Sequence, residues 1–148
     1  MSPSFYHSAI MAVVASVINN LRRFRAFTEL TIVIGDKDYT PDISVYPWKK
    51  VDYYSGDIIK MKELPLLAIE ILSPTQGAQE LFDKAKIYLQ AGIQSVWIVQ
   101  PLAHTISVLN HQETKHYHEG MIQDITGITL NIATIFDEDE DDDSASNI

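Results

Sequence analysis

Two carboxylates occupy positions from which they could take part in chemistry. Glu70 lies in the middle of LLAIEILSP, residues 66–74, a stretch otherwise apolar enough for a buried strand. Asp42 follows Pro41 at the start of a second predicted strand. A buried, unpaired carboxylate is costly or changes its pKa until it is neutral. Glu70 therefore requires a partner, which could be a cation, a metal or a hydrogen-bond donor.

The pair suggests a metal site. If the two strands are neighbours, Asp42 and Glu70 can point into the same space, where two carboxylates need a cation or a shared proton. Mg²⁺ suits such a site, because it takes one or two carboxylates and completes its shell with water and phosphate. A metal held there could activate water and stabilise the charge that develops on a phosphodiester. A structural ion-pair network, with Glu70 paired to Lys84, is the alternative.

The hydrophobic pattern predicts the helices and strands that could position Asp42 and Glu70. Apolar residues at helical spacing predict a helix over residues 6–24, with Ser2 or Ser4 as its cap and Arg22, Arg23 and Arg25 at its C-terminal end. A second helix is predicted over residues 78–91, ended by Gly92. A polar loop is expected over residues 47–64. Strands are predicted at 27–34, 42–46, 66–72, 95–100, 105–109 and 114–118, and residues 128–136 form a strand or a short helix. This order predicts an α/β fold with a mixed sheet.

Composition limits the classes of protein. The 148 residues favour one domain, over residues 1–136, followed by a disordered acidic tail, residues 137–148. The net charge is −9, but seven acids lie in that tail, so the domain is nearly balanced, with 13 acids and 11 bases. The chain contains no cysteine, which excludes disulfides and thiolate metal sites and fits a cytoplasmic protein. No apolar run approaches the roughly 20 residues that cross a bilayer, so no membrane partner is expected.

Several motifs together resemble a known family. Pro41-Asp42, then Glu70-Ile71-Leu72 in an apolar strand, then a helix that carries lysine, resemble the PD-(D/E)XK nuclease superfamily. The block from Glu70 to Pro101, with EILSPT, KAKIY, AGI and VWIVQP, resembles the Uma-type restriction endonuclease family more closely. MSPSFYHSAI and TGITLNIATIF also resemble that family, so the similarity covers roughly residues 1–136.

The resemblance implies a restriction-endonuclease-like fold, with a central mixed β-sheet flanked by helices, and a role for each matching residue. Asp42 and Glu70 would hold Mg²⁺ or Mn²⁺, with the carbonyl oxygen of Ile71 as a further ligand. The superfamily's lysine normally stands two places after the acid, where this chain has Leu72. In the Uma-type family the lysine lies on the following helix, four places before a tyrosine, which selects Lys84 and Tyr88.

On this resemblance, Lys84 would orient the attacking water or stabilise the developing charge. Helical geometry alone does not choose between Lys84 and Lys86, which flank the buried stripe almost symmetrically. The implied activity is that of a Mg²⁺-dependent endodeoxyribonuclease acting on DNA, and the implied assembly is a homodimer. The alternative function is a nuclease-fold module that no longer cuts and binds nucleic acid or a partner protein.

Other residues have two interpretations each. Glu29 is a candidate third acid or an exposed strand residue. His7 lies on the apolar stripe of the first helix, where a packed, hydrogen-bonded histidine is preferred over a catalytic one. Trp48 and Trp97 are predicted to pack rather than to stack on bases. Candidate contacts to nucleic acid lie in the loop between the two acids, at Lys49, Lys50, Lys60 and Lys62.

Overall fold

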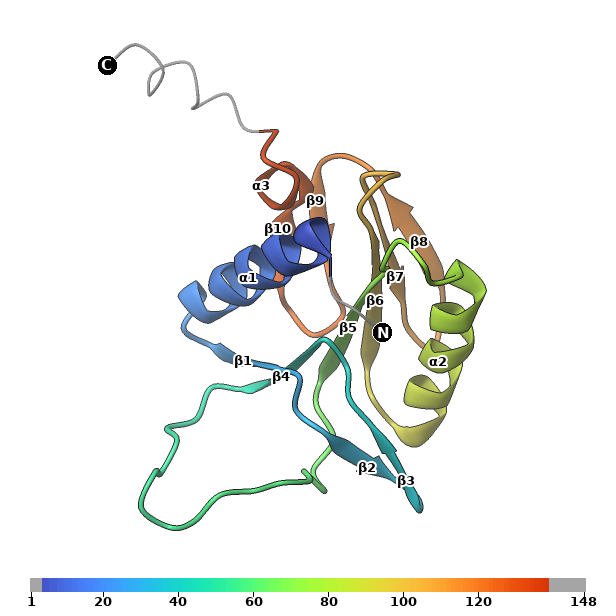
Figure 1. Cartoon of the computed structure of the whole chain (residues 1–148). Helices are drawn as coiled ribbons and strands as arrows, with labels where there is room; N and C mark the ends of the chain where they lie inside the picture. Colours follow the sequence, from blue (N-terminus) through green and yellow to red (C-terminus); the bar gives the residue numbers. More distant parts are fainter. Residues whose placement is uncertain (1–3, 139–148) are drawn as a thin grey trace, which may run out of the picture.

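A six-stranded mixed sheet forms the centre of the computed structural model, which describes residues 4–138 (Figure 1). Its strand order is β1-β4-β5-β6-β7-β8, and every neighbouring pair is antiparallel except β5 and β6. The sheet consists of β1 (Phe24–Thr28), β4 (Ile43–Pro47), β5 (Leu67–Ile71), β6 (Ser95–Gln100), β7 (Thr105–Leu109) and β8 (Thr114–Tyr117). One helix covers each face, and the two faces hold separate apolar clusters. The predicted α/β fold with a mixed sheet and flanking helices is confirmed.

The first helix, α1 (Phe5–Asn20), packs on one face through residues spaced four apart, Ile10, Val14 and Ile18. Its cap is Ser4, whose side chain accepts a hydrogen bond from the His7 N–H at 3.1 Å. The helix ends before the predicted residue 24, because Arg22 adopts a left-handed conformation, with φ of 60°. The arginines expected at the helix end therefore lie beyond it: Arg22 and Arg23 in the link to β1, and Arg25 in β1 itself.

The single strand predicted over residues 27–34 is wrong. It is divided into β1 and β2 (Ile32–Ile34) by Glu29, whose φ of 54° breaks the extended backbone. β2 pairs with β3 (Lys37–Tyr39), a strand that is absent from the sequence prediction. Strands of three residues are too short to show alternation in a sequence.

The central βαβ unit matches the predicted boundaries closely. β5 is buried along its whole length, because α1 packs on one face of the sheet and α2 (Ala78–Ala91) on the other. Gly92 ends α2 in a left-handed conformation, and its N–H donates to the carbonyl oxygens of Leu89 and Tyr88. The helix returns the chain to β6, parallel to β5.

The C-terminal part adds a further hairpin on the α1 side of the sheet. β9 (Met121–Gln123) pairs with β10 (Thr129–Asn131), and α3 (Ile132–Ile135) follows at once, so residues 128–136 contain both a strand and a short helix. The acidic tail beyond Glu138 lies outside the described residues. Within residues 4–138, no helix is both long enough and apolar enough to span a bilayer.

Candidate active site

Glu70 lies at the carboxyl end of β5, and its side chain points to the α2 face of the sheet, as does that of Ala68 two residues earlier. Two side chains of α2 reach one of its oxygens. The Tyr88 hydroxyl donates a hydrogen bond of 2.6 Å to Oε2, and Lys84 Nζ lies 3.9 Å from the same atom. The partners that a buried carboxylate requires are therefore a phenol and an ammonium group on one helix.

Asp42 lies across from Glu70. β4 pairs with β5 in the register Ile43–Ile69, so continuing the pairing by one residue places Asp42 opposite Glu70. Asp42 Oδ2 accepts a hydrogen bond of 2.7 Å from the Ile71 N–H. This bond fixes the carboxylate at the end of β5, next to the backbone whose carbonyl was expected to act as a ligand.

His7 contacts the same Asp42 oxygen from α1, the helix on the other face of the sheet from α2. It is buried in the first turns of α1, and its Nε2 lies 3.1 Å from Asp42 Oδ2. Its other ring nitrogen, Nδ1, is buried and has no hydrogen-bond partner among the described residues. The pattern matches a tautomer in which Nε2–H donates to Asp42 and Nδ1 carries no proton. His7 is therefore a packed, buried histidine that also positions the Asp42 carboxylate.

The environment of Glu70 favours its protonated form. Burial is the main cause that raises its pKa from 4.5 to about 7, and the nearby charge of Asp42 acts in the same direction. The hydrogen bond from Tyr88 and the charge of Lys84 oppose this effect only in part. Burial of the Tyr88 hydroxyl, followed by the charge of Glu70, raises the pKa of that hydroxyl, which stays a donor. A divalent cation beside Asp42 and Glu70 would relieve the unfavourable charge.

These values predict how stability depends on pH without metal. The folded protein holds the Glu70 proton to a higher pH than the unfolded chain, so this contribution to stability is complete below about pH 4.5 and is lost as pH rises through about 7. Its size is about 3 kcal/mol, since each pKa unit corresponds to about 1.4 kcal/mol. Urea unfolding of the wild type and of Glu70→Gln, both in chelator, should diverge by this amount between these pH values. Parallel curves would contradict the raised pKa.

The structure distinguishes the two lysines that the helical pattern left equivalent. Lys84 is half-buried and faces Glu70, whereas Lys86 is exposed. Asp42, Glu70, Lys84 and Tyr88 thus come together at one end of the sheet, where β4, β5 and α2 meet.

Comparisons with known proteins bear on this arrangement. The model of the Uma2 family, described as "Putative restriction endonuclease", matches residues 1–131. The chain belongs to the Uma2 family. A solved structure, described as "a putative nuclease belonging to DUF820" from Anabaena variabilis, is similar, with a TM-score of 0.81 and 30% sequence identity. The alignment covers 93% of this chain and 83% of that one. No curated protein matches the chain. The family resemblance found in the sequence is confirmed.

The metal that this nuclease-like fold implies fits the residues present. Both described contacts of the Asp42 carboxylate use Oδ2, and its side chain is partly exposed. In an extended strand the N–H and C=O of one residue point to the same side, so the Ile71 carbonyl faces Asp42 as its N–H does. No group of three or more histidine, aspartate or glutamate side chains suited to a metal lies within residues 4–138. Two carboxylates with a carbonyl and water suffice for Mg²⁺.

Other candidate residues of the Uma2 chain lie apart from this centre. Glu29 is exposed, and its N–H donates to the Asp42 carbonyl oxygen at 3.0 Å, so the contact uses its backbone. Lys60 pairs with Asp38 at 2.7 Å, near the β2–β3 hairpin, and Lys62 is exposed nearby. Lys49 and Lys50 are exposed just after β4.

The two tryptophans differ. Trp97 is buried, and its Nε1–H donates to Asp124 Oδ1 at 2.9 Å, as a packing role requires. Trp48 is 53% exposed, so the packing role predicted for it is wrong. It follows β4 directly, and the side chain that lies over its ring is the Arg25 guanidinium, at 5.1 Å from the ring centre.

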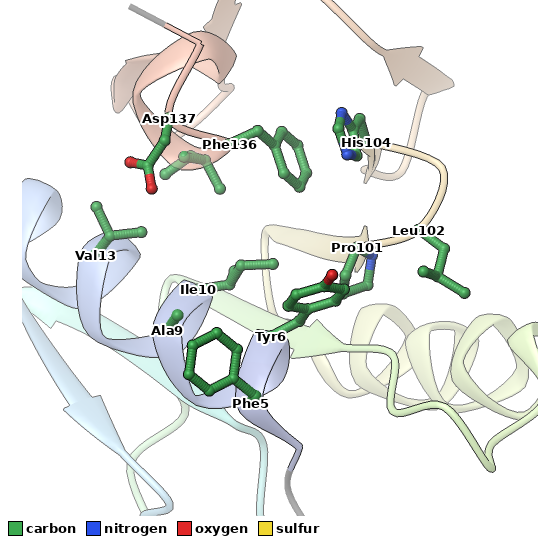
Figure 2. Close-up of a pocket in the computed structure, with 11 residues that line it drawn as sticks. Phe5, Tyr6, Ala9, Ile10, Val13, Pro101, Leu102, His104, Phe136 and Asp137 are labelled. Atoms are coloured by element: carbon green, nitrogen blue, oxygen red, sulfur yellow. The ribbon is translucent and has the colours of Figure 1, made fainter. Parts of the chain in front are cut away.

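A cavity elsewhere in the Uma2 fold contains none of the candidate catalytic residues. It lies between the start of α1, the β6–β7 turn and the end of α3, and Figure 2 shows Tyr6, Pro101 and Phe136 on its wall. Because this cavity is mainly apolar, it offers no carboxylate pair for a metal.

The contact between His7 and Asp42 was missed from the sequence. His7 is 35 residues from Asp42 and belongs to the opposite layer, so no local pattern could have paired them. The signal present was a histidine on an otherwise apolar helical stripe, which favours a buried hydrogen-bonded role.

Proposed function

We propose that this protein is a metal-dependent endonuclease that hydrolyses DNA phosphodiester bonds, with Mg²⁺ or Mn²⁺ as its cofactor. The observation that carries the proposal is the placement of Asp42 and Glu70 opposite one another on adjacent strands, with Lys84 Nζ 3.9 Å from Glu70 Oε2. The family and the similar solved structure, both described as nucleases, support it.

Each residue then has a distinct task. Asp42, Glu70 and the Ile71 carbonyl would hold the cation, which supplies charge stabilisation to a phosphodiester and lowers the pKa of water. The Ile71 N–H and His7 keep the Asp42 carboxylate in place, and the Tyr88 hydroxyl does the same for Glu70. Lys84 places an ammonium group beside the carboxylates, where it can orient a water molecule or stabilise developing negative charge.

The test of the metal site is a titration of melting temperature with MnCl₂ or MgCl₂, on the wild type and on Glu70→Gln. Saturation to about 100 times Kd should stabilise the wild type by about 2.7 kcal/mol, which corresponds to a rise of about 5–10 °C for a chain of this length. Glu70→Gln should lose this rise. It retains the acidic tail, so any effect of metal on the tail persists in both proteins. Equal rises would assign Glu70 to a structural ion pair.

A second candidate function is a nuclease-fold module that binds nucleic acid or a partner protein without cutting. Its support is the charge of the chain, −9 overall and slightly acidic even without the tail, whereas duplex-binding proteins usually carry a basic surface. Stabilisation by metal without cleavage of supercoiled or single-stranded DNA would favour this module.

We also propose a homodimer in the cytoplasm. The dimer rests on the family resemblance alone, and the cytoplasmic location on the absence of cysteine from the chain. Sedimentation velocity measures the assembly directly, and a monomer at micromolar concentration would contradict the proposed dimer.

A further inference from the structure

The long loop between β4 and β5 exposes aromatic rings among lysines. It extends away from the body of the molecule (Figure 1). In its first part, Trp48 is 53% exposed, Tyr53 82% and Tyr54 100%. Lys49 and Lys50 lie between these rings in the sequence and are exposed as well. A group of large apolar side chains left in water is one mark of a binding surface.

The structure holds these rings outward. The Asp52 carboxylate accepts the Tyr54 N–H at 2.9 Å, which forms the turn that presents Tyr53 and Tyr54 to solvent. The Trp48 N–H donates to the Arg23 carbonyl oxygen at 2.9 Å, which ties the start of the loop to β1. The Arg25 guanidinium lies 5.1 Å from the centre of the Trp48 ring, and the Lys49 ammonium 5.2 Å from that of Tyr46.

Positive charge is concentrated at the same place. Five of the eleven lysines and arginines fall in residues 22–25 and 49–50, two segments joined by the pairing of β1 with β4. Within residues 4–138, the lysines in described ion pairs are Lys60, Lys84 and Lys115, and none of these five takes part. The cluster is therefore available to an anion. In a chain with net charge −9, it marks where a polyanion would approach.

Arg25, in this cluster of cations, lies on the same face of the sheet as the candidate active site. Ser44 pairs with Ala68, and Arg25 pairs with Tyr46, so strand alternation puts Arg25 on the same face as Glu70. Asp42 and Trp48 lie at opposite ends of β4, about 20 Å apart along the strand. A nucleic acid strand bound along β4 would span that distance.

We infer that Arg25, Trp48, Lys49, Lys50, Tyr53 and Tyr54 form a binding surface for single-stranded nucleic acid, which begins about 20 Å along β4 from Asp42. Bases stack on the exposed rings, and the cations contact phosphates, the combination by which single strands are held without sequence readout. In a duplex the base faces are stacked on each other, so the rings could contribute little. This inference deepens the proposed nuclease function and depends on it for the substrate class.

Binding can be measured separately from cutting. The probes are a fluorescein-labelled oligothymidylate of about 20 nucleotides and a duplex of the same length, read by fluorescence anisotropy in chelator with the full chain. The test variant is Tyr53→Ala with Tyr54→Ala. The matched control is Ile58→Ala with Ile59→Ala, because these two side chains are 58% and 85% exposed on the same loop but cannot stack.

The tyrosine variant should raise Kd for the single strand by about 10-fold or more and leave duplex binding nearly unchanged, whereas the isoleucine variant should bind both as the wild type does. Lys49→Gln with Lys50→Gln should lower the slope of log K against log salt by roughly 1.4 on the single strand. Melting temperatures should be unaltered, since all of these side chains are exposed.

Three results would overturn the inference. One is an equal loss on the duplex, and another is no loss in the tyrosine variant. The third is an equal loss in the isoleucine variant accompanied by a change in sedimentation, which would assign the loop to contacts with a second copy of the chain. Binding of the single strand, with no cleavage of either single-stranded or supercoiled DNA, would refute the nuclease and keep the surface. Cleavage and binding unaffected by the tyrosine variant would refute the surface and keep the nuclease.

Discussion

Glu70→Gln is expected to lower metal-dependent DNA cleavage by about 10³-fold or more, since a metal contributes several kcal/mol to stabilising the transition state. The substitution preserves shape and can still accept the hydrogen bond from Tyr88, but it removes the charge that would hold the cation. The fold should tolerate it, because the environment of Glu70 already favours a neutral side chain, with a pKa of about 7. The measurement is the rate of nicking of supercoiled plasmid in Mg²⁺ and in Mn²⁺.

Glu80→Gln is the matched control for this loss. Glu80 lies in the first turn of α2, is exposed, and carries the same carboxylate away from the candidate site. It should cut as the wild type does, and Asp42→Asn should lose as much activity as Glu70→Gln. If Glu70→Gln retained metal-dependent cleavage, the acid pair would not be the catalytic metal site.

Lys84→Met is expected to reduce cleavage by about 10²–10³-fold while metal still raises the melting temperature, because the ammonium group acts on charge in the reaction and is not a ligand. Lys84 also opposes the rise in the Glu70 pKa, so its removal should move the pH profile of cleavage to higher pH. Single-turnover rates over a range of pH would measure both effects. A merely structural ion pair would not move the profile in this way.

Lys86→Met supplies the control for Lys84, because Lys86 is two residues away on the same helix but is exposed. It should leave both the rate and the pH profile unchanged. If the two variants lost activity equally, the contact between Lys84 and Glu70 would carry no special role. If Lys84→Met also abolished stabilisation by metal, the lysine would support the acid pair and not the reaction.

The family and the activity class rest on local sequence blocks. The stretch from Glu70 to Pro101 carried the resemblance, and the family match over residues 1–131 confirms it. The βαβ unit was also predictable in detail, since α2 has a strong amphipathic period, Gly92 ends it, and continuous apolar runs lead to buried parallel strands. These signals are local in the sequence, so tertiary contacts had little effect on the type and bounds of these elements.

The apolar run around Glu70 is enough to predict a carboxylate in a buried strand, which needs a partner. The identity of that partner depends on how distant elements pack. The pairing of β4 with β5 places Asp42 beside Glu70, the rotation of α2 turns Lys84 and not Lys86 toward it, and the packing of α1 brings His7 to Asp42. Each contact joins segments 14 to 35 residues apart in the chain. Hydrophobic periodicity reports which side of an element is buried but carries no information about which distant element covers it.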